Sequence, residues 1–371
     1  MKKNRLAIIV TLVLIVIAIV LVWNNRYLTT LRGDAYDFTV RDTASVTRLF
    51  FADKSGNEVT LSRTSEGWKV NDKYDAQPVM INNMLHTLDK MRIKMPVSLA
   101  SHDNVITRMA GTNTKVEVYQ IVPRINLFNK IKLFPHEKRT KVFYIGDITQ
   151  DNNGTYVLKE GADKAYIVHL HGFRGFISSR FSASEEDWRD HKVFYNNMND
   201  ITSVKLEFNN DKKNSFVINT IDNYSYEMAC LDGSHIDLDT IKVLSLLTSL
   251  SDARFEAFLS DITEQRRDSI INSPYLERLT ITTKEGKESS IRTYTMKVNA
   301  EAFGFTEDDW DNDPDHKYAY IEHNDELVMI QDFAFGKILK PAEYYNKGYM
   351  EQQRMIYIEE LEEIPSGNLP F

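Results

Sequence analysis

Two stretches of this sequence share one pattern and decide the fold: "YDAQPVMINNMLHTLDKMRIKMPVS" at residues 74–98 and "IDLDTIKVLSLLTSLSDARFEAFLS" at residues 236–260. Aligned without gaps, they match at a few polar positions, such as Asp75 with Asp237. In both stretches, apolar residues recur at the three- and four-residue spacing of an amphipathic helix. We therefore predict two equivalent helices, each with an Asp near its start that caps the helix or complements its dipole.

Segments that alternate apolar and polar residues surround each predicted helix, as half-buried strands do. A pair of such segments precedes the first helix, at residues 45–53 and 58–71, and another pair precedes the second, at residues 203–210 and 214–230. Further strand-like segments follow each helix, and each half ends on an aromatic run, "GFRGF" or "DFAFGKI". This shared order predicts an α+β protein in which an internal duplication gives two similar β-β-α-β lobes.

The N-terminal residues have the pattern of a membrane anchor. "MKKNR" is basic, and the residues from Leu6 to Trp23 carry no charge. As a helix, this segment would span roughly 27 Å, enough to cross the hydrocarbon core of a bilayer. Basic residues before the span favour a cytoplasmic N-terminus, so we predict an uncleaved signal anchor with the remaining chain outside. A cleaved signal peptide is the alternative, since the two differ mainly in the length of the apolar region.

Length and composition exclude several classes of protein. The 371 residues exceed what one hydrophobic core usually serves, so two domains follow the anchor. A net charge of −8 argues against a nucleic-acid-binding protein. The single cysteine, Cys230, excludes an intramolecular disulfide and favours a bacterial envelope protein over a secreted eukaryotic one. The predicted segments are a cytoplasmic tail (1–5), a transmembrane anchor (6–23), a linker (24–40), a first α+β lobe (41–190), a second α+β lobe (191–350) and a C-terminal tail (351–371).

The stretch "HGFRGFISSRFSASEEDWRDHKVF" at residues 171–194 ends the first lobe and begins the second. Its arginines lie beside aromatic and acidic residues, so a guanidinium can stack on a ring or pair with a carboxylate. Its serines have no Gly-x-Ser-x-Gly context that would mark a nucleophile. We predict that the stretch is a joint between the lobes and has no catalytic role. The predicted joint residues are Phe173, Arg174, Arg180, Trp188, Arg189 and Asp190.

A basic and apolar segment, "PRINLFNKIKLFPHEKRTK" at residues 123–141, departs from the acidic balance of the chain and contains one acid, Glu137. Interleaved basic and apolar side chains suit an anionic membrane surface or an acidic partner protein. A hairpin with ordinary surface lysines is the alternative. The predicted contact residues are Arg124, Phe128, Lys130, Lys132, Phe134 and Arg139.

Two further patterns are incomplete metal sites. His169 and His171 face one side of a predicted strand, but the spacing supplies no third ligand. The acids of "EDDWDNDPDH", residues 307–316, begin like a calcium loop, but Pro314 and Tyr320 stand where that loop requires Gly and Glu. The sequence contains no phosphate-binding, zinc-protease or serine-hydrolase motif. We therefore predict no metal and no cofactor.

The chain resembles an uncharacterised bacterial family, domain of unknown function 4340. The resemblance lies in the basic tail and apolar segment followed by "VTRLFF", "GWKVNDKYDA", "FYIGD", "FRGFISSRF" and "DWRD", and it runs over most of residues 1–345. It implies a membrane-anchored envelope protein without assigned catalytic residues, and some related domains occur with transporter auxiliary proteins. Residues 120–140 are an insertion relative to the family pattern.

Together these patterns favour a non-enzymatic module that binds or scaffolds a partner in the bacterial inner membrane. The expected partners are the membrane itself and an envelope or transporter protein, with no nucleic acid. The alternative is a hydrolase-like or metal-dependent enzyme with a site between the two lobes. A concave pocket that gathers polar groups with perturbed pKa values would distinguish the enzyme from the module.

Overall fold

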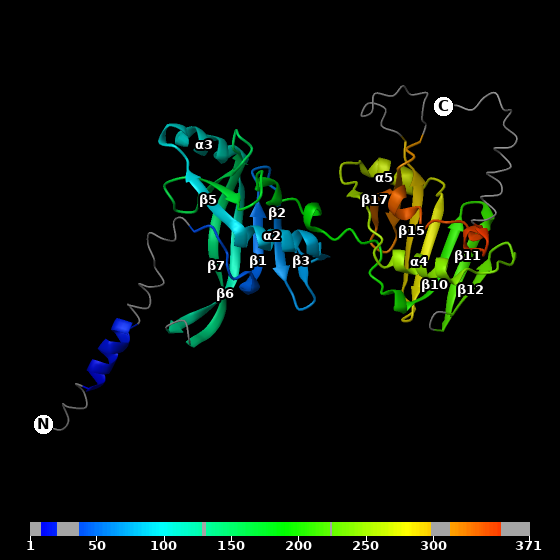
Figure 1. Cartoon of the computed structure of the whole chain (residues 1–371), viewed down its shortest axis with the longest axis horizontal. Coiled ribbons are helices and arrows are strands. Elements are labelled where there is room, and N and C mark those ends of the chain that lie inside the picture. Colours follow the sequence, from blue (N-terminus) through cyan, green and yellow to red (C-terminus); the bar gives the residue numbers. More distant parts are fainter. Residues whose placement is uncertain (1–8, 21–36, 128–130, 223–224, 298–311, 350–371) are drawn as a thin grey trace. The chain divides into compact units, whose positions relative to one another are not determined.

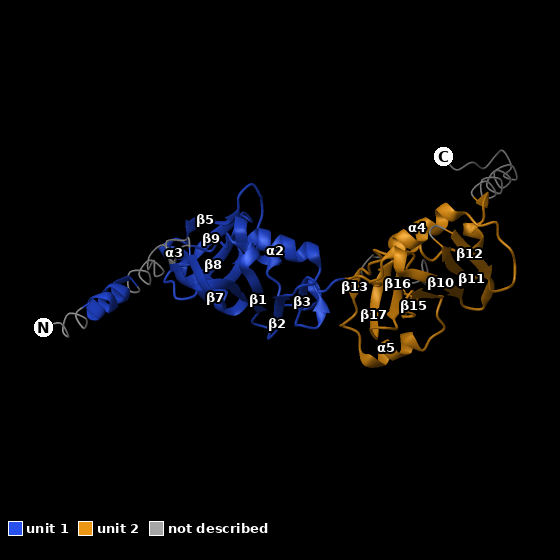
Figure 2. Cartoon of the chain, turned by 90° about the horizontal axis from the view of Figure 1, so that it is seen from below, with its two compact units in different colours: residues 1–190 blue, residues 191–371 orange. Residues whose placement is uncertain are grey.

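The computed structural model describes residues 9–20, 37–127, 131–222, 225–297 and 312–349. The chain divides into two compact units, residues 1–190 (unit 1) and residues 191–371 (unit 2), shown in Figure 2. Each unit contains one large antiparallel sheet with helices packed on it (Figure 1). The predicted α+β class, with two antiparallel sheets, is confirmed.

The described part of unit 1 forms a nine-stranded sheet in the order β4-β3-β2-β1-β6-β7-β8-β9-β5. Strands β6 to β9 follow one another as hairpins, and β5 completes the edge by pairing with β9. Helix α2 (Pro78–Lys90) precedes β5, and helix α3 (Leu99–Thr112) follows it. The strands are β1 Val46–Ala52, β2 Glu58–Arg63, β3 Trp68–Val70, β4 Tyr74–Asp75, β5 Met91–Pro96, β6 Thr114–Leu127, β7 Ile131–Ile148, β8 Thr155–Lys159 and β9 Tyr166–Leu170.

The two helices of unit 1 contribute to separate cores. Helix α2 buries an apolar stripe, including Ile81 and Leu88, in the main core of the unit. Helix α3 buries Val105 and Met109 in a smaller cluster with side chains from β7 to β9. Successive strand residues point to opposite faces, which places Phe143 in the main core and Tyr144 in the smaller cluster.

The described part of unit 2 forms an eight-stranded sheet in the order β12-β11-β10-β14-β15-β16-β17-β13. Helix α4 (Thr240–Leu250) buries four apolar residues in the main core of this unit, whereas α5 (Glu264–Ile271) contributes Ile270 to a second cluster. The strands are β10 Ile201–Phe208, β11 Asp211–Asp222, β12 Ser225–Cys230, β13 Ala257–Phe258, β14 Glu277–Thr283, β15 Glu288–Thr295, β16 His316–Ile321 and β17 Glu326–Gln331, and a short helix, α7 (Asp332–Phe335), follows β17.

Over the folded residues that the structure describes, from β1 onward, the strands and α-helices of the two units follow the same order once β4 and α7 are left out: three strands, a helix, a strand, a helix and four strands. The strand orders of the two sheets agree in the same way. Each unit therefore contains more elements than the β-β-α-β order expected from the sequence. Helices α2 and α4 hold equivalent places in this order, as the aligned stretches predicted.

The helix caps differ from the prediction that Asp75 and Asp237 mark the two helix starts. In α4 the cap is Asp239, whose side chain accepts a hydrogen bond from the Ile241 amide at 3.0 Å. Helix α2 has no side-chain cap, and Pro78 occupies its first turn. Proline suits that position because its missing N–H would have no partner within the helix.

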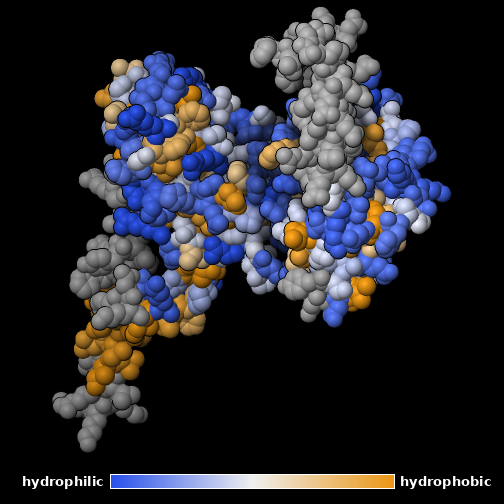
Figure 3. Space-filling model, turned by 45° about the vertical axis from the view of Figure 1, so that its right-hand side comes forward, coloured by the Kyte–Doolittle hydropathy of each residue, from blue (hydrophilic) through white to orange (hydrophobic). Residues whose placement is uncertain are grey.

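The predicted anchor at residues 6–23 extends beyond the described residues at both ends. Its described part, residues 9–20, is helical, and its apolar side chains are exposed (orange in Figure 3). Among the described residues, no helix has the length and apolar character that crossing a membrane requires.

Candidate functional site

Strands β6 and β7 extend past the body of the unit 1 sheet as a two-stranded ribbon, visible below the sheet in Figure 1. Strand β1 pairs with β6 only as far as Gln120, and β8 pairs with β7 from Phe143 onward. Residues 121–127 and 131–137, called the ribbon here, pair with each other throughout the described part. The ribbon contains most of the predicted contact segment.

The predicted contact residues fall at different places along this hairpin. Arg124, Lys132 and Phe134 are exposed on the ribbon, and Arg139 lies at its root. Phe134 is 65% exposed and has a φ of 55°, the left-handed region that costs a residue with a Cβ about 1–2 kcal/mol. The remaining two predicted contact residues, Phe128 and Lys130, lie outside the described residues.

A buried carboxylate holds the root of the ribbon together. The Glu117 side chain is 8% exposed and accepts from Lys115 Nζ at 2.6 Å, Arg139 Nη1 at 3.0 Å and the Tyr119 hydroxyl at 2.5 Å. Burial opposes its ionisation, but the hydrogen bonds from Lys115 and Tyr119 and the nearby positive charges outweigh burial and hold the pKa of Glu117 below its ordinary value. Arg139 thus has a structural role here, as an ion-pair partner of the buried Glu117.

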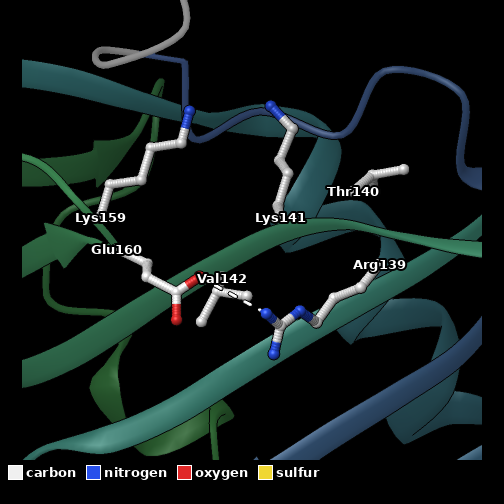
Figure 4. A pocket seen from close by; sticks show the side chains of 6 residues that line it. All are labelled: Arg139, Thr140, Lys141, Val142, Lys159 and Glu160. Atoms are coloured by element: carbon white, nitrogen blue, oxygen red, sulfur yellow. Dashed lines mark ion pairs between the residues drawn. The ribbon is translucent and has the colours of Figure 1, made fainter.

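A small polar pocket of about 170 Å³ lies beside the root and is lined by Arg139, Thr140, Lys141, Val142, Lys159 and Glu160 (Figure 4). Within it, Arg139 lies 3.7 Å from Glu160, and Lys141 donates to Asp37 at 3.0 Å. Two of the three cations that line the pocket thus have carboxylate partners, and the third is Lys159.

The predicted joint stretch contributes to the main core of unit 1. Trp188 is 1% exposed and stacks on Phe51 with ring centroids 5.2 Å apart, and its Nε1 donates to the Ser182 carbonyl at 3.0 Å. Phe181 is also buried in this core and lies edge-on to Phe143. The stretch therefore packs along the sheet before it reaches the boundary between the units.

Two arginines of the stretch, Arg180 and Arg189, lie over aromatic rings. The Arg189 guanidinium lies 3.5 Å from the ring centroid of Tyr74, on β4. The Arg180 guanidinium lies 5.2 Å from the Phe173 ring and donates to Thr87 Oγ1 on α2 at 2.9 Å.

The last two predicted joint residues, Arg174 and Asp190, differ in their surroundings. Arg174 is exposed, and the Asp190 amide donates to the Asp75 carbonyl at 2.8 Å. A role for the stretch in joining the two units stays a prediction.

Equivalent backbone bonds attach the end of each unit to the segment before its first long helix. In unit 1, the Gln77 amide donates to the Trp188 carbonyl at 2.8 Å. In unit 2, the Asp239 amide donates to the Tyr345 carbonyl, also at 2.8 Å. Trp188 and Tyr345 are both buried. These two aromatic residues thus occupy matching positions, and backbone bonds of this kind leave no residue pattern in the sequence that could have revealed them.

The two histidines of the predicted His-x-His pair lie at the end of β9 and just after it. His169 is half-buried, and burial together with the charges of Lys94 and His171 lowers its pKa. Over the ranges that the structure describes, no group of three or more His, Cys, Asp or Glu side chains is placed to hold a metal ion. The two histidines are thus not joined by a third potential ligand in this part of the chain.

The acidic loop at 307–316 is described only from residue 312 onward, so Asp309 and Asp311 lie outside the described residues. Asp313 accepts from the Asp315 and His316 amides at 2.8 and 3.0 Å, which fixes the start of β16. The His316 ring lies between two carboxylates, 3.0 Å from Asp313 through Nδ1 and 3.2 Å from Glu256 through Nε2. Burial lowers the pKa of His316, but the hydrogen bond and charge of Asp313 and the charge of Glu256 raise it by more, so the net pKa lies above its ordinary value.

Sequence reasoning missed the Glu256–His316 pair because strand pairing creates it. Strands β13 and β16 both pair with β17, one on each side of it. Glu256, just before β13, therefore lies near His316, the first residue of β16. The Glu256 amide donates to the Met329 carbonyl on β17 at 2.8 Å, which fixes that approach. A prediction of the contact between Glu256 and His316 would have required the strand order of the sheet.

The fold and these sites define a two-unit α+β protein with an exposed basic ribbon on unit 1. The chain belongs to the family described as Domain of unknown function (DUF4340), which matches residues 68–270. The match runs from β3 in unit 1 to α5 in unit 2, and over this range the resemblance drawn from the sequence is confirmed. Its extent over most of residues 1–345 stays a prediction. No curated protein and no solved structure matches the chain.

Proposed function

We propose that this protein is anchored in the bacterial inner membrane by a single N-terminal span, with its N-terminus in the cytoplasm and both units in the periplasm or outside the cell. The observation that carries the proposal is the apolar helix at residues 9–20, whose side chains are exposed along its length, from Ile9 at 60% to Val20 at 40%. A soluble surface rarely leaves such a run in water, so a bilayer is its natural environment. The basic residues of "MKKNR" favour this orientation.

We further propose that the two units arose by internal duplication. Their common element order supports this proposal, as do the equivalent backbone bonds from Gln77 to Trp188 and from Asp239 to Tyr345. Convergence on a sheet order with so many shared steps is less economical than copying one unit. Domain boundaries close to residues 40, 190 and 350 remain part of this proposal.

The two units serve, on this proposal, as a non-enzymatic module that binds or scaffolds a partner protein of the envelope, with a transporter as the first class to test. Of the large apolar side chains that the described part of unit 2 exposes, Phe333 at 85% and Ile241 at 77% are the most exposed. Apolar side chains of this size are suited to the centre of a protein–protein contact. A tether that holds such a module at the membrane keeps it near membrane-bound partners and raises their effective concentration.

The alternative of an enzyme has one observation in its favour, the His316 ring between Asp313 and Glu256. A carboxylate that orients a histidine is part of several catalytic arrangements. However, both ring nitrogens of His316 contact carboxylates and its pKa is raised, which favours the charged form over a free base. This geometry is therefore better suited to an ion cluster that links the residue before β13 to the start of β16, across β17.

Topology is tested by reporter fusions at the C-terminus of the full chain. A reporter that is active only outside the cytoplasm should be active, and one that is active only inside should be silent. The opposite result would contradict the anchor orientation. A second pair of fusions to a chain without residues 1–23 is the control and should reverse the outcome.

Partner binding is tested by photocrosslinking in native membranes. A photoreactive residue replaces Phe333 or Ile241 in the full chain, and Ser55, in the exposed turn between β1 and β2, serves as the control position. A protein adduct of constant mass from the unit 2 positions, and not from Ser55, is the expected result. The absence of such an adduct from membrane-inserted chains would refute a partner contact at Phe333 and Ile241.

A further inference from the structure

The ribbon of unit 1 has one apolar face and one basic face. Partners in the register share a face, and residues two apart along a strand do so as well. The register places Pro123 opposite Pro135 and Ile125 opposite Leu133. The first face carries Ile121, Pro123, Ile125, Ile131, Leu133 and Pro135, with the acid Glu137 at the root, and the second carries Val122, Arg124, Lys132, His136 and, at the root, Lys138.

The apolar face is open to solvent in the described structure. Ile131 is 51% exposed, Leu133 43% and Ile121 42%, although Ile and Leu side chains are normally among the most buried. Elsewhere on the ribbon, the left-handed Phe134 exposes a further aromatic side chain, at 65%, although the register gives it no partner on this face. A two-stranded ribbon has no second layer of protein to cover such a face. Any group that covers this face must therefore come from outside unit 1.

The positive charges of the ribbon are uncompensated. Arg124, Lys132 and Lys138 form no ion pair with any residue that the structure describes. The one acid of the ribbon, Glu137, is already paired with Arg48 at 2.9 Å. The ribbon thus presents unpaired cations together with apolar side chains, in a protein whose net charge is −8.

The same hairpin in unit 2 has no such extension. Strands β14 and β15 hold the places of β6 and β7 but contain 7 and 8 residues, against 14 and 18 in unit 1. The β14–β15 hairpin shows that the sheet is complete without a ribbon. The extension therefore serves unit 1, which is the unit that follows the apolar N-terminal segment.

The chain enters unit 1 at the root of the ribbon. Lys141 Nζ, on β7, donates to the Asp37 carbonyl at 2.9 Å and to Oδ2 of Asp37 at 3.0 Å. The preceding residues 21–36 can span at most roughly 55 Å when fully extended. From Lys141 to Ile131, the ribbon extends roughly 33 Å. A chain anchored through its N-terminal segment can therefore bring the ribbon to the surface of the same bilayer.

We propose that the ribbon docks on anionic lipids of the membrane that holds the N-terminal segment. The inference rests on the proposed membrane anchor. The apolar face enters the boundary between headgroups and acyl chains, as the apolar face of an interfacial helix does. Arg124, Lys132 and Lys138 then lie at the level of the lipid phosphates and bind them by charge. Docking fixes unit 1 on the bilayer at two points, the anchor and the ribbon.

The test uses the full chain in vesicles, with an environment-sensitive fluorophore on Leu133→Cys. Cys230 is buried and stays unlabelled in the folded chain. In vesicles with phosphatidylglycerol, the emission should shift to the blue, and lipids with brominated acyl chains should quench it. Vesicles of phosphatidylcholine alone should give the emission of a water-exposed label. The same label on Ser55→Cys, in an exposed turn of unit 1, is the matched control and should not respond to lipid composition.

A second experiment removes the positive charges from the ribbon and its root. Each of the three substitutions Arg124→Gln, Lys132→Gln and Lys138→Gln should lower the ratio of docked to free ribbon roughly fivefold. Raising the salt concentration to about 1 M, where the Debye length is about 3 Å, should have a similar effect on the unmodified ribbon. The substitutions lie on exposed side chains without ion pairs, so loss of folding does not confuse the result.

The proposal is overturned if the Leu133 label reports the same water-exposed environment in both kinds of vesicle. It is also overturned if a photoreactive residue at Phe134 yields a protein adduct in native membranes and no lipid adduct. Flotation after an alkaline wash reports the anchor separately, because the wash removes peripheral proteins and leaves spanning segments in place. A chain that fails flotation contradicts the anchor, and the label on that chain, mixed with the same vesicles, still reports whether the ribbon binds lipid.

Discussion

Trp188→Ala should destabilise unit 1 and leave the stability of unit 2 unchanged. Trp188 is 1% exposed, its ring stacks on Phe51 at 5.2 Å and 13°, and its Nε1 bonds to the Ser182 carbonyl. These contacts all lie in unit 1. Replacing a buried Trp by Ala costs roughly 3–5 kcal/mol, since the lost transfer energy adds to the cavity that remains. Such a loss is a large part of the stability of a domain of this size.

Hydrogen exchange followed by mass spectrometry measures the effect in each unit separately. At a tenfold change for each 1.4 kcal/mol, the slowest amides of unit 1 should exchange roughly a hundred to a few thousand times faster in the variant. The slowest amides of unit 2 should keep their wild-type rates. Trp188→Phe, which keeps a ring against Phe51 but removes the Nε1 donor, should show a smaller effect of about 1 kcal/mol.

The matched control is Tyr345→Ala, at the equivalent position of unit 2. Tyr345 is fully buried and lies edge-on to Phe216 with ring centroids 5.1 Å apart. This variant should accelerate exchange in unit 2 alone. Unchanged amides of unit 1 in Trp188→Ala, or equal acceleration in both units, would refute the assignment of Trp188 to the core of unit 1.

Three further outcomes follow from single groups. Tyr345→Phe should stabilise unit 2 by about 1 kcal/mol in urea titrations, because the buried Tyr345 hydroxyl finds no hydrogen-bond partner in the described structure; a loss of stability would contradict this. His316→Gln should cost more stability at pH 5.5 than at pH 8.5. The pKa of His316 is raised in the folded protein, so its protonation stabilises the fold below about pH 6.5, and this contribution disappears as the pH rises through the folded pKa. Equal losses of melting temperature at both pH values would contradict this contribution. Gly336→Ala should destabilise unit 2 by about 1–3 kcal/mol in the same titrations, because the new Cβ would lie 2.6 Å from the Asp332 carbonyl oxygen; an unchanged midpoint would show that the backbone relaxes there.

The sequence was sufficient to predict the elements with strong periodicity. Helices α2 and α4 have clear apolar stripes, so their existence follows from spacing alone, whereas their equivalence was predicted from the shared order of the segments around them. Helix α5 is different, since its sequence "EQRRDSII" is mostly polar and only Ile270 is buried. The edge strand β13 has two residues, too few to show any alternation. Both elements exist through tertiary contacts that a local pattern does not contain.

The candidate sites divide in the same way. The basic and apolar character of the ribbon is a property of consecutive residues, so it could be predicted before the structure. The separation into two faces could not, because it depends on the register that places Ile125 opposite Leu133. The Arg189–Tyr74 contact likewise depends on how the end of unit 1 returns to β4, a step that sequence spacing does not encode.

The comparison of the two units separates what the fold requires from what it does not. Both sheets form with the same strand order, and both cores close on a buried aromatic residue, Trp188 or Tyr345. The ribbon has no counterpart in the described part of unit 2, and it leaves apolar side chains in water and Phe134 in a strained conformation. Features that lower stability and are dispensable for folding persist when they have a function. The ribbon is therefore the part of unit 1 where a function is most directly expected, and its root at Lys141, bonded to Asp37, ties that function to the segment that leads to the proposed anchor.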